Sequence, residues 1–149
     1  MDVKSGVKGF LKDKWNIAFL VILTIAAIIR IRYMLNDSMW PDEALYIWYG
    51  YKLLHSPSYF FSTEFSHTIS YFPSIIIAVL SIFFSSFVAG KIMSLLFGLA
   101  GITFAYLLGR EIKDGFIGLI AAILLSFNYI HWFYSDRVLL DVPLTAMFI

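Results

Sequence analysis

Four long stretches of the chain are apolar and contain no Asp, Glu, Lys or Arg. They are residues 15–29, 68–90, 92–109 and 115–134. None of them alternates polar and apolar residues with a period of two, so the pattern predicts helices rather than strands. A bilayer core takes about 20 helical residues, and only helices or closed barrels satisfy their backbone groups in lipid. The pattern therefore predicts an all-α integral membrane protein.

The first apolar stretch follows a tail, residues 1–14, that contains four lysines. Lysine-rich flanks stay in the cytoplasm, so we expect the tail inside and the chain after the first span outside. The stretch reaches spanning length if it continues to residue 35, with Arg30 and Arg32 extending outward to the membrane surface. We therefore expect a first span at 15–35.

The second stretch, residues 68–90, leaves two topologies open. If it spans, Lys91 is cytoplasmic and the later turn with Arg110 and Lys113 is outside. If it lies along the outer interface, that turn is cytoplasmic and the C-terminal acidic stretch returns to the outer side. Charge slightly favours the second arrangement, because Arg110 and Lys113 outweigh Lys91. Hydropathy alone favours a span.

Composition supports a membrane protein and removes several function classes. Of the 149 residues 60% are hydrophobic and 14% are charged, whereas soluble domains contain about 25% charged residues. The net charge of +1 gives no reason to expect nucleic acid as a partner. Without cysteine, the chain has no disulfide, no thiolate nucleophile and no Cys-based metal site.

Asp42 and Glu43 are the first candidates for chemistry, and two interpretations of them stay open. Pro41 suits the first position of a helix, and acids in the first turn interact favourably with the helix dipole. An interfacial helix at about 41–54 with an acidic start is therefore one interpretation. In the other, an interfacial carboxylate is partly desolvated, which raises its basicity and suits it to proton abstraction.

The residues around this pair resemble a known family. "MWPDEALYIWYGYKLL" resembles the Asp-Glu motif in the first outer loop of protein O-mannosyltransferase-like enzymes, which belong to the GT-C class of membrane glycosyltransferases. "SDRVLLDVPLTAMF" resembles the family's Ser-Arg and Leu-Leu-Asp stretch in the second outer loop, with Arg137 one place late and Asp136 in its position. "EFSHTISYFPSIII" resembles its His-Pro-Pro segment, with Thr68 and Ile69 in place of the two prolines.

The resemblance implies a GT-C type N-terminal module with about three transmembrane helices and both acidic motifs on the outer side. It therefore favours the second topology. The expected segments are a cytoplasmic tail (1–14), a first span (15–35), an outer loop (36–91) with interfacial helices at about 41–54 and 69–88, a second span (92–109), a cytoplasmic turn (110–114), a third span (115–134), a second outer loop (135–143) and the start of a further helix (144–149). Because this last segment is apolar and uncapped, we expect the chain to be the N-terminal part of a longer protein.

The resemblance also implies an activity. A sugar such as mannose would be carried on a polyprenyl or dolichyl phosphate and transferred, with inversion, to a hydroxyl of a protein or glycan. Asp42 would be the base, and Glu43 would support the acceptor or orient Asp42. Asp141 would be a second acid that shapes the site, although it could equally cap the next helix. Arg137 would pair with a phosphate or carboxylate.

Glu64 and His67 are further candidates for substrate binding. Together with Asp42 and Glu43 they could offer a divalent cation an oxygen-rich site, but no ligand spacing supports one. We therefore expect neither a metal nor another cofactor. A lone histidine at a helix start is also compatible with a purely interfacial role for His67.

Two other function classes remain. A non-catalytic membrane subunit or scaffold could use the acidic outer loop to bind a partner protein. A transporter fragment is disfavoured, because the spans show no charge that would line a path. For the enzyme, we expect an integral protein of the cell membrane, or of the endoplasmic reticulum in a eukaryote, with its site on the outer or lumenal face.

Overall fold

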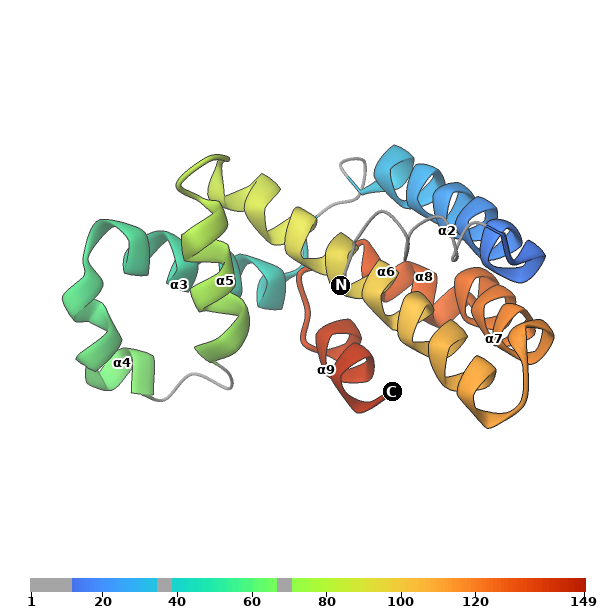
Figure 1. The fold of residues 1–149 in the computed structure, drawn as a ribbon. Helices are drawn as coiled ribbons and strands as arrows, with labels where there is room; N and C mark the ends of the chain where they lie inside the picture. The colour runs from blue at the N-terminus through green and yellow to red at the C-terminus, as the bar shows by residue number, and fades with distance from the viewer. Residues whose placement is uncertain (1–11, 35–38, 67–70) are drawn as a thin grey trace.

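The protein is helical throughout the residues that the structure describes. The computed structural model describes residues 12–34, 39–66 and 71–149, and in these ranges every regular element is a helix (Figure 1). The elements are α2 (Lys14–Tyr33), α3 (Pro41–His55), the 3-10 helix η1 (Pro57–Phe61), α4 (Thr63–Ser66), α5 (Tyr71–Leu80), α6 (Ser86–Ile112), α7 (Gly115–Phe127), α8 (Tyr129–Ser135) and α9 (Asp141–Phe148).

Helix α6 is the axis of the molecule. Its 27 residues make it about 40 Å long, and it packs against α2, α3, α5, α7, α8 and α9. Figure 1 shows α3 and α5 beside the start of α6, with α4 farther out, and α2 and α7 along the second half of α6. The two groups of helices therefore share α6 but occupy different parts of it.

Polar contacts set the direction of α2 relative to α6. Asp13, just before α2, lies 3.3 Å from Arg110 near the end of α6. Asn16 accepts hydrogen bonds from Arg110, at 2.7 Å, and from the hydroxyl of Tyr106. The start of α2 is thus fixed to the end of α6. The two helices run antiparallel, and the end of α2 lies toward the start of α6.

Two buried apolar clusters correspond to these two groups of helices. The first joins α3, α5 and α6 to the segment before α9, and comprises Tyr46, Ile77, Ala89, Met93, Val138 and Leu139. The second joins α2, α6 and α7, and comprises Phe19, Ala26, Ile102, Tyr106 and Ala122. Close approach of α6 and α7 depends on glycine, because a Cβ on Gly109 would lie 2.8 Å from the Cα of Gly118.

The prediction of an all-helical chain with about three candidate membrane spans is confirmed for the described residues. Helices α2 and α6 are each long and apolar enough to cross a bilayer, and α7 with α8 makes a third candidate span if the bent pair is counted as one. Large apolar side chains remain exposed along α2, α6 and α7, as expected for surfaces that face lipid.

In its described part, residues 71–90, the second apolar stretch forms neither one span nor the single interfacial helix predicted over 69–88. Helix α5 covers only ten residues, about 15 Å, which is too short to cross a bilayer. A turn follows, and the Ser85 hydroxyl then accepts a hydrogen bond from the Val88 N–H. This cap starts α6 at Ser86, so the second candidate span is longer at both ends than the predicted 92–109.

The predicted third span is broken. Asn128 ends α7, and its side chain accepts a hydrogen bond of 2.9 Å from the His131 N–H, which starts α8. The two helices meet at an angle of 64°. The last helix, α9, begins at Asp141 rather than at 144, with Leu140 as its N-cap residue, so Asp141 occupies the first turn and is not the cap.

The expectation that Arg30 and Arg32 both extend outward is wrong for Arg30. Arg32 is exposed, whereas only 1% of Arg30 is exposed and its guanidinium lies against α7 and α8. Lys91, on α6, is also fully buried. The candidate spans therefore do contain buried charges, contrary to the sequence-based argument.

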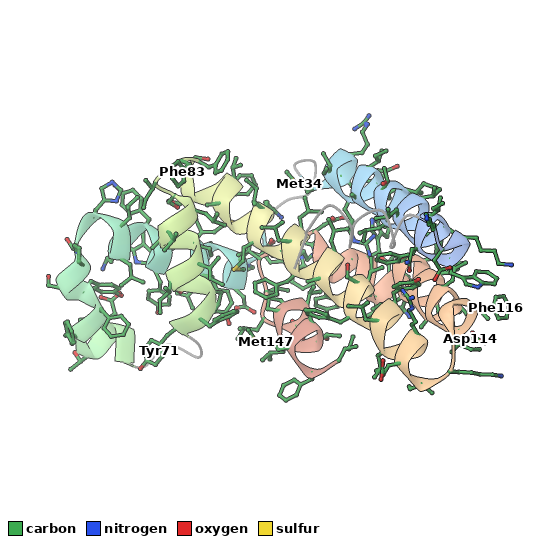
Figure 2. The ribbon with its side chains drawn as sticks, in the orientation of Figure 1. Met34, Tyr71, Phe83, Asp114, Phe116 and Met147 are labelled. Carbon is green, nitrogen blue, oxygen red and sulfur yellow. The ribbon has the colours of Figure 1, made fainter. Side chains whose placement is uncertain are left out.

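The fold predicts that single cysteines at Thr63 and Lys113 will be labelled from opposite sides of the membrane. Both residues are exposed. Thr63 belongs to α4, on the side of the molecule where α6 begins, and Lys113 directly follows the end of α6. Figure 2 shows the same separation for Phe83 and Asp114, which flank α6. Labelling of intact and permeabilised cells with a membrane-impermeant maleimide measures this, and the chain has no native cysteine to interfere. A Met39→Cys variant is the matched control and should behave like Thr63→Cys. Labelling of Thr63→Cys and Lys113→Cys from one side would contradict the arrangement.

Candidate functional site

A buried carboxylate, that of Glu43, joins the two acidic segments of the chain. Its Oε1 accepts hydrogen bonds from the Val138 N–H at 2.8 Å and from the Lys91 ammonium at 2.9 Å. Its Oε2 accepts one from the Trp40 N–H at 2.8 Å and lies 3.4 Å from Nη1 of Arg137. Glu43 has no exposed surface. One side chain thus connects α3, α6 and the segment that precedes α9.

The local sequence explains how α3 presents Glu43. Pro41 is the first helical residue, as the sequence predicted, and Trp40 is the N-cap residue. Glu43 is then the third helical residue, and from this position a glutamate side chain reaches back to the N-cap N–H. The same geometry turns its other oxygen toward α6 and the 136–138 segment. The Glu43 carboxylate therefore both caps the start of α3 and makes tertiary contacts.

Lys91 and Arg137 complete this arrangement from the other two segments. The Lys91 ammonium also donates a 2.7 Å hydrogen bond to the Asp136 carbonyl. The Arg137 guanidinium lies over the rings of Trp40 and Phe133, with its central carbon 4.2 and 4.4 Å from the two ring centres. Such cation–π contacts are favourable and strengthen when the cation is desolvated. The contact of Lys91 with Glu43 was not expected from the sequence, where the charge of Lys91 bears only on topology.

Burial and hydrogen bonding act in opposite directions on Glu43. Burial raises the pKa of its carboxyl, because the charged form loses hydration. The N–H groups of Trp40 and Val138, together with Lys91, lower it by binding the ionised form, and they prevail, so the net pKa lies below its ordinary value. Glu43 is therefore a permanent anion near neutral pH.

Asp42 and Asp141 lie at the same end of the molecule, and their expected position on the outer side of the membrane stays a prediction. Both are exposed, each in the first turn of its helix. Burial raises the pKa of the Tyr46 hydroxyl, and the negative charges of Asp42 and Asp141 raise it further. The two carboxylates thus both raise the pKa of one tyrosine. The buried contacts of Glu43 hold the segments that carry these carboxylates together.

Asp141 also lines a groove of about 450 Å³ between α7, α8 and α9. Its other lining residues are Leu125, Asn128, Ile130, His131, Tyr134, Val142 and Thr145. Volumes of this size are typical of small-molecule sites. The groove offers a concave, partly polar surface beside one of the two exposed acids.

Glu64 is not brought to this site. It is exposed and pairs with Lys52 near the end of α3, with an Nζ–Oε2 distance of 3.2 Å. Lys52 is ten residues after Asp42, which places it about 15 Å along the helix. The pKa of Glu64 is lowered by the nearby Tyr59 hydroxyl and by Lys52. His67 lies outside the described residues. Across the described ranges no three His, Asp or Glu side chains gather as a metal site would require.

Comparison with protein-family models, with curated proteins and with solved structures found no match for this chain. The interpretation of the site therefore depends on its own geometry.

Replacing Glu43 by Gln should destabilise the fold by about 3–5 kcal/mol, because it leaves the buried Lys91 ammonium without its counter-charge. Chemical unfolding of the purified protein in detergent measures this free energy. Glu64→Gln is the matched control: its pair with Lys52 is exposed, so this variant should leave the free energy of unfolding nearly unchanged. Equal stabilities for the two variants would contradict the role given to Glu43.

The same carboxylate predicts a pH dependence. Because the folded pKa of Glu43 lies below its ordinary value of 4.5, its stabilisation is fully present above pH 4.5 and is lost as the pH falls through the folded pKa. The difference in unfolding free energy between wild type and Glu43→Gln should therefore narrow below about pH 4.5. A gap that stays constant as the pH falls would contradict this.

Proposed function

We propose that the protein is a membrane glycosyltransferase that moves a hexose, mannose-like, from a polyprenyl or dolichyl phosphate to a hydroxyl of a protein or glycan. The observation that carries this proposal is the bond between Glu43 and Val138. It brings together the two segments whose motifs resemble those of protein O-mannosyltransferase-like enzymes. Asp42 and Asp141, the exposed acids of these two segments, therefore lie at the same end of the molecule.

The proposed reaction is a single inverting displacement. The acceptor hydroxyl oxygen attacks the anomeric carbon and forms the new glycosidic bond, while the bond from that carbon to the phosphate oxygen breaks. The lipid phosphate leaves with the bonding electron pair, and Asp42 takes the hydroxyl proton. Asp42 suits this role because it is exposed on a helix turn that buried contacts hold in place.

Glu43 and Arg137 receive positioning roles in this proposal. Both oxygens of Glu43 are already hydrogen bonded within the protein. We therefore assign Glu43 to orient Asp42 rather than to contact the acceptor. Arg137 is 5% exposed and lies between Glu43 and two aromatic rings. We therefore assign it to hold the second segment through the Glu43 carboxylate, which is one of the two partners, phosphate or carboxylate, expected from the sequence.

The groove beside Asp141 is the proposed sugar site. Its polar lining residues are Asn128, His131, Tyr134, Asp141 and Thr145. Hydroxyl, amide and carboxylate groups at one concave surface suit a hexose, which presents both donors and acceptors. With the lysine-rich tail in the cytoplasm, this end of the molecule would face the cell exterior or the lumen.

A non-catalytic membrane subunit is the second candidate, and a specific observation favours it. Glu43, one half of the acidic pair, is completely occupied by structural contacts. Helix α3 also exposes apolar and aromatic side chains, Leu45, Trp48 and Tyr51, that could face a partner protein. The exposed Asp42 would then be only a favourable helix start.

The Asp42→Asn variant should distinguish the glycosyltransferase from the non-catalytic membrane subunit. In membranes containing the full-length protein, with polyprenyl-phosphate mannose as donor and a Ser/Thr-containing peptide as acceptor, we expect transfer to fall at least about 100-fold, because the base is lost. Thermal stability should change little, since Asp42 is exposed. Glu111→Gln, an exposed acid near the far end of α6, is the control and should leave transfer unchanged. Undiminished transfer by Asp42→Asn would overturn the proposed base and favour the structural role.

A further inference from the structure

A second groove, separate from the one beside Asp141, lies between α2 and the α7–α8 bend. Its volume is about 410 Å³, and the two grooves share no lining residue. It is lined by Ala26, Ile29, Arg30, Tyr33, Ser126, Phe127, Tyr129 and Trp132. Most of these residues are apolar or aromatic, and Arg30 provides the only full charge among them.

Arg30 contacts only neutral acceptors there. Its Nη1 donates to the Ala26 carbonyl at 3.3 Å, and its Nη2 lies 3.4 Å from the Ser126 carbonyl and 3.1 Å from Nδ1 of His131. The charge of Asp136 acts on Arg30 through space, but no ion pair of Arg30 occurs among the described residues. A guanidinium that is 1% exposed and lacks a direct counter-charge is costly in an apolar environment.

Three residues that line this groove each have a buried donor atom with no hydrogen-bond partner in the described part of the chain. These donors are Nε of Arg30, the Ser126 hydroxyl and Nε1 of Trp132. A buried donor without a partner destabilises the protein in the absence of a ligand. All three can donate, and two of them can only donate. The complementary ligand is therefore an anion with several acceptor oxygens.

The position of the groove relates this anion to the bilayer. Arg30 is three residues before the end of α2 at Tyr33, about 4.5 Å along the helix, which is near the membrane surface if α2 spans. Aromatic rings form its rim: Trp132 makes edge contacts with Tyr33 at 5.6 Å and with Tyr129 at 6.0 Å. Tyrosine and tryptophan favour this headgroup level.

We propose that the groove binds the phosphate group of a membrane lipid. Arg30 supplies the charge, and Ser126 and Trp132 supply further hydrogen bonds to the phosphate oxygens. The lipid chains would follow the exposed apolar surface of α2 and α7. An isoprenoid phosphate and an anionic phospholipid share this chemistry. The proposal concerns binding alone and does not depend on sugar transfer.

Binding also requires a local movement. The unpartnered donor atoms have essentially no exposed surface, so the rings of Trp132 or Tyr33 turn aside as the phosphate enters. The indole of Trp132 then exchanges an apolar contact for a hydrogen bond to an anion. Its fluorescence should change on binding, and the change should be absent in a Trp132→Phe variant.

The test is a titration of the purified full-length protein in neutral detergent with an isoprenyl monophosphate, with phosphatidylglycerol, with the isoprenyl alcohol and with inorganic phosphate. We expect the phosphate lipids to bind and the alcohol and inorganic phosphate to bind at least about tenfold more weakly. Arg30→Gln should weaken lipid binding about tenfold or more, because a charged hydrogen bond is lost. Arg32→Gln, its exposed neighbour, is the matched control and should stay within about twofold.

Trp132→Phe and Ser126→Ala serve as second variants if Arg30→Gln does not fold. Each removes one donor and should weaken lipid binding severalfold. Unchanged binding in these variants, equal binding of the alcohol, or equal binding of inorganic phosphate would overturn the proposal. The relative affinities of the isoprenyl phosphate and phosphatidylglycerol identify the natural class. Asp42→Asn should bind phosphate lipids like the wild type, so loss of transfer and loss of binding remain distinguishable.

Discussion

The ionised side chain of Glu43 is the constraint on which the arrangement of this protein depends. A carboxylate without solvent contact needs partners for both oxygens, and it finds them on its own helix cap, on α6 and on the segment before α9. Removing a charge from water is expensive, so these partners cannot separate without a large cost. The first turns of α3 and α9, and with them Asp42 and Asp141, are therefore held in one region by a residue that does not itself face solvent.

Much of the helical pattern was predictable, because apolar length and helix-start chemistry are local properties. The start of α3 at Pro41 follows from proline and acids in sequence, and α2 follows from an uncharged run. The positions at which one helix ends and the next begins were harder to predict from the sequence. Ser85 and Asn128 each begin a new helix through one side-chain hydrogen bond, and neither residue stands out within an otherwise continuous apolar run. Hydropathy averages across such positions, so it merged or misplaced the helices on either side.

The site was predicted in outline but not in its connections. The acidic pair and Asp141 were identified as candidates from local motifs, whereas Lys91 was counted only as a charge. Its contact with Glu43 joins residues 48 apart in the sequence, and no local pattern contains that information. Arg30 was missed for a related reason: an arginine near a helix end usually extends to water, but here α7 provides a carbonyl and α8 an imidazole. Glu64 was placed too near because the sequence does not show that α3 separates it from Asp42.

The 64° bend at Asn128 gives the short helix α8 an unusual position. Its seven residues form a partition about one helix thick: Tyr129 and Trp132 face one groove, and Ile130, His131 and Tyr134 face the other. The imidazole of His131 accepts from Arg30 on one side of this partition and borders the cavity on the other. A straight span would have carried these residues away from α9 and left a single surface. The kink thus places two grooves on opposite sides of one short helix. Because His131 borders one groove and contacts Arg30 of the other, a charge bound in either groove would act electrostatically on both.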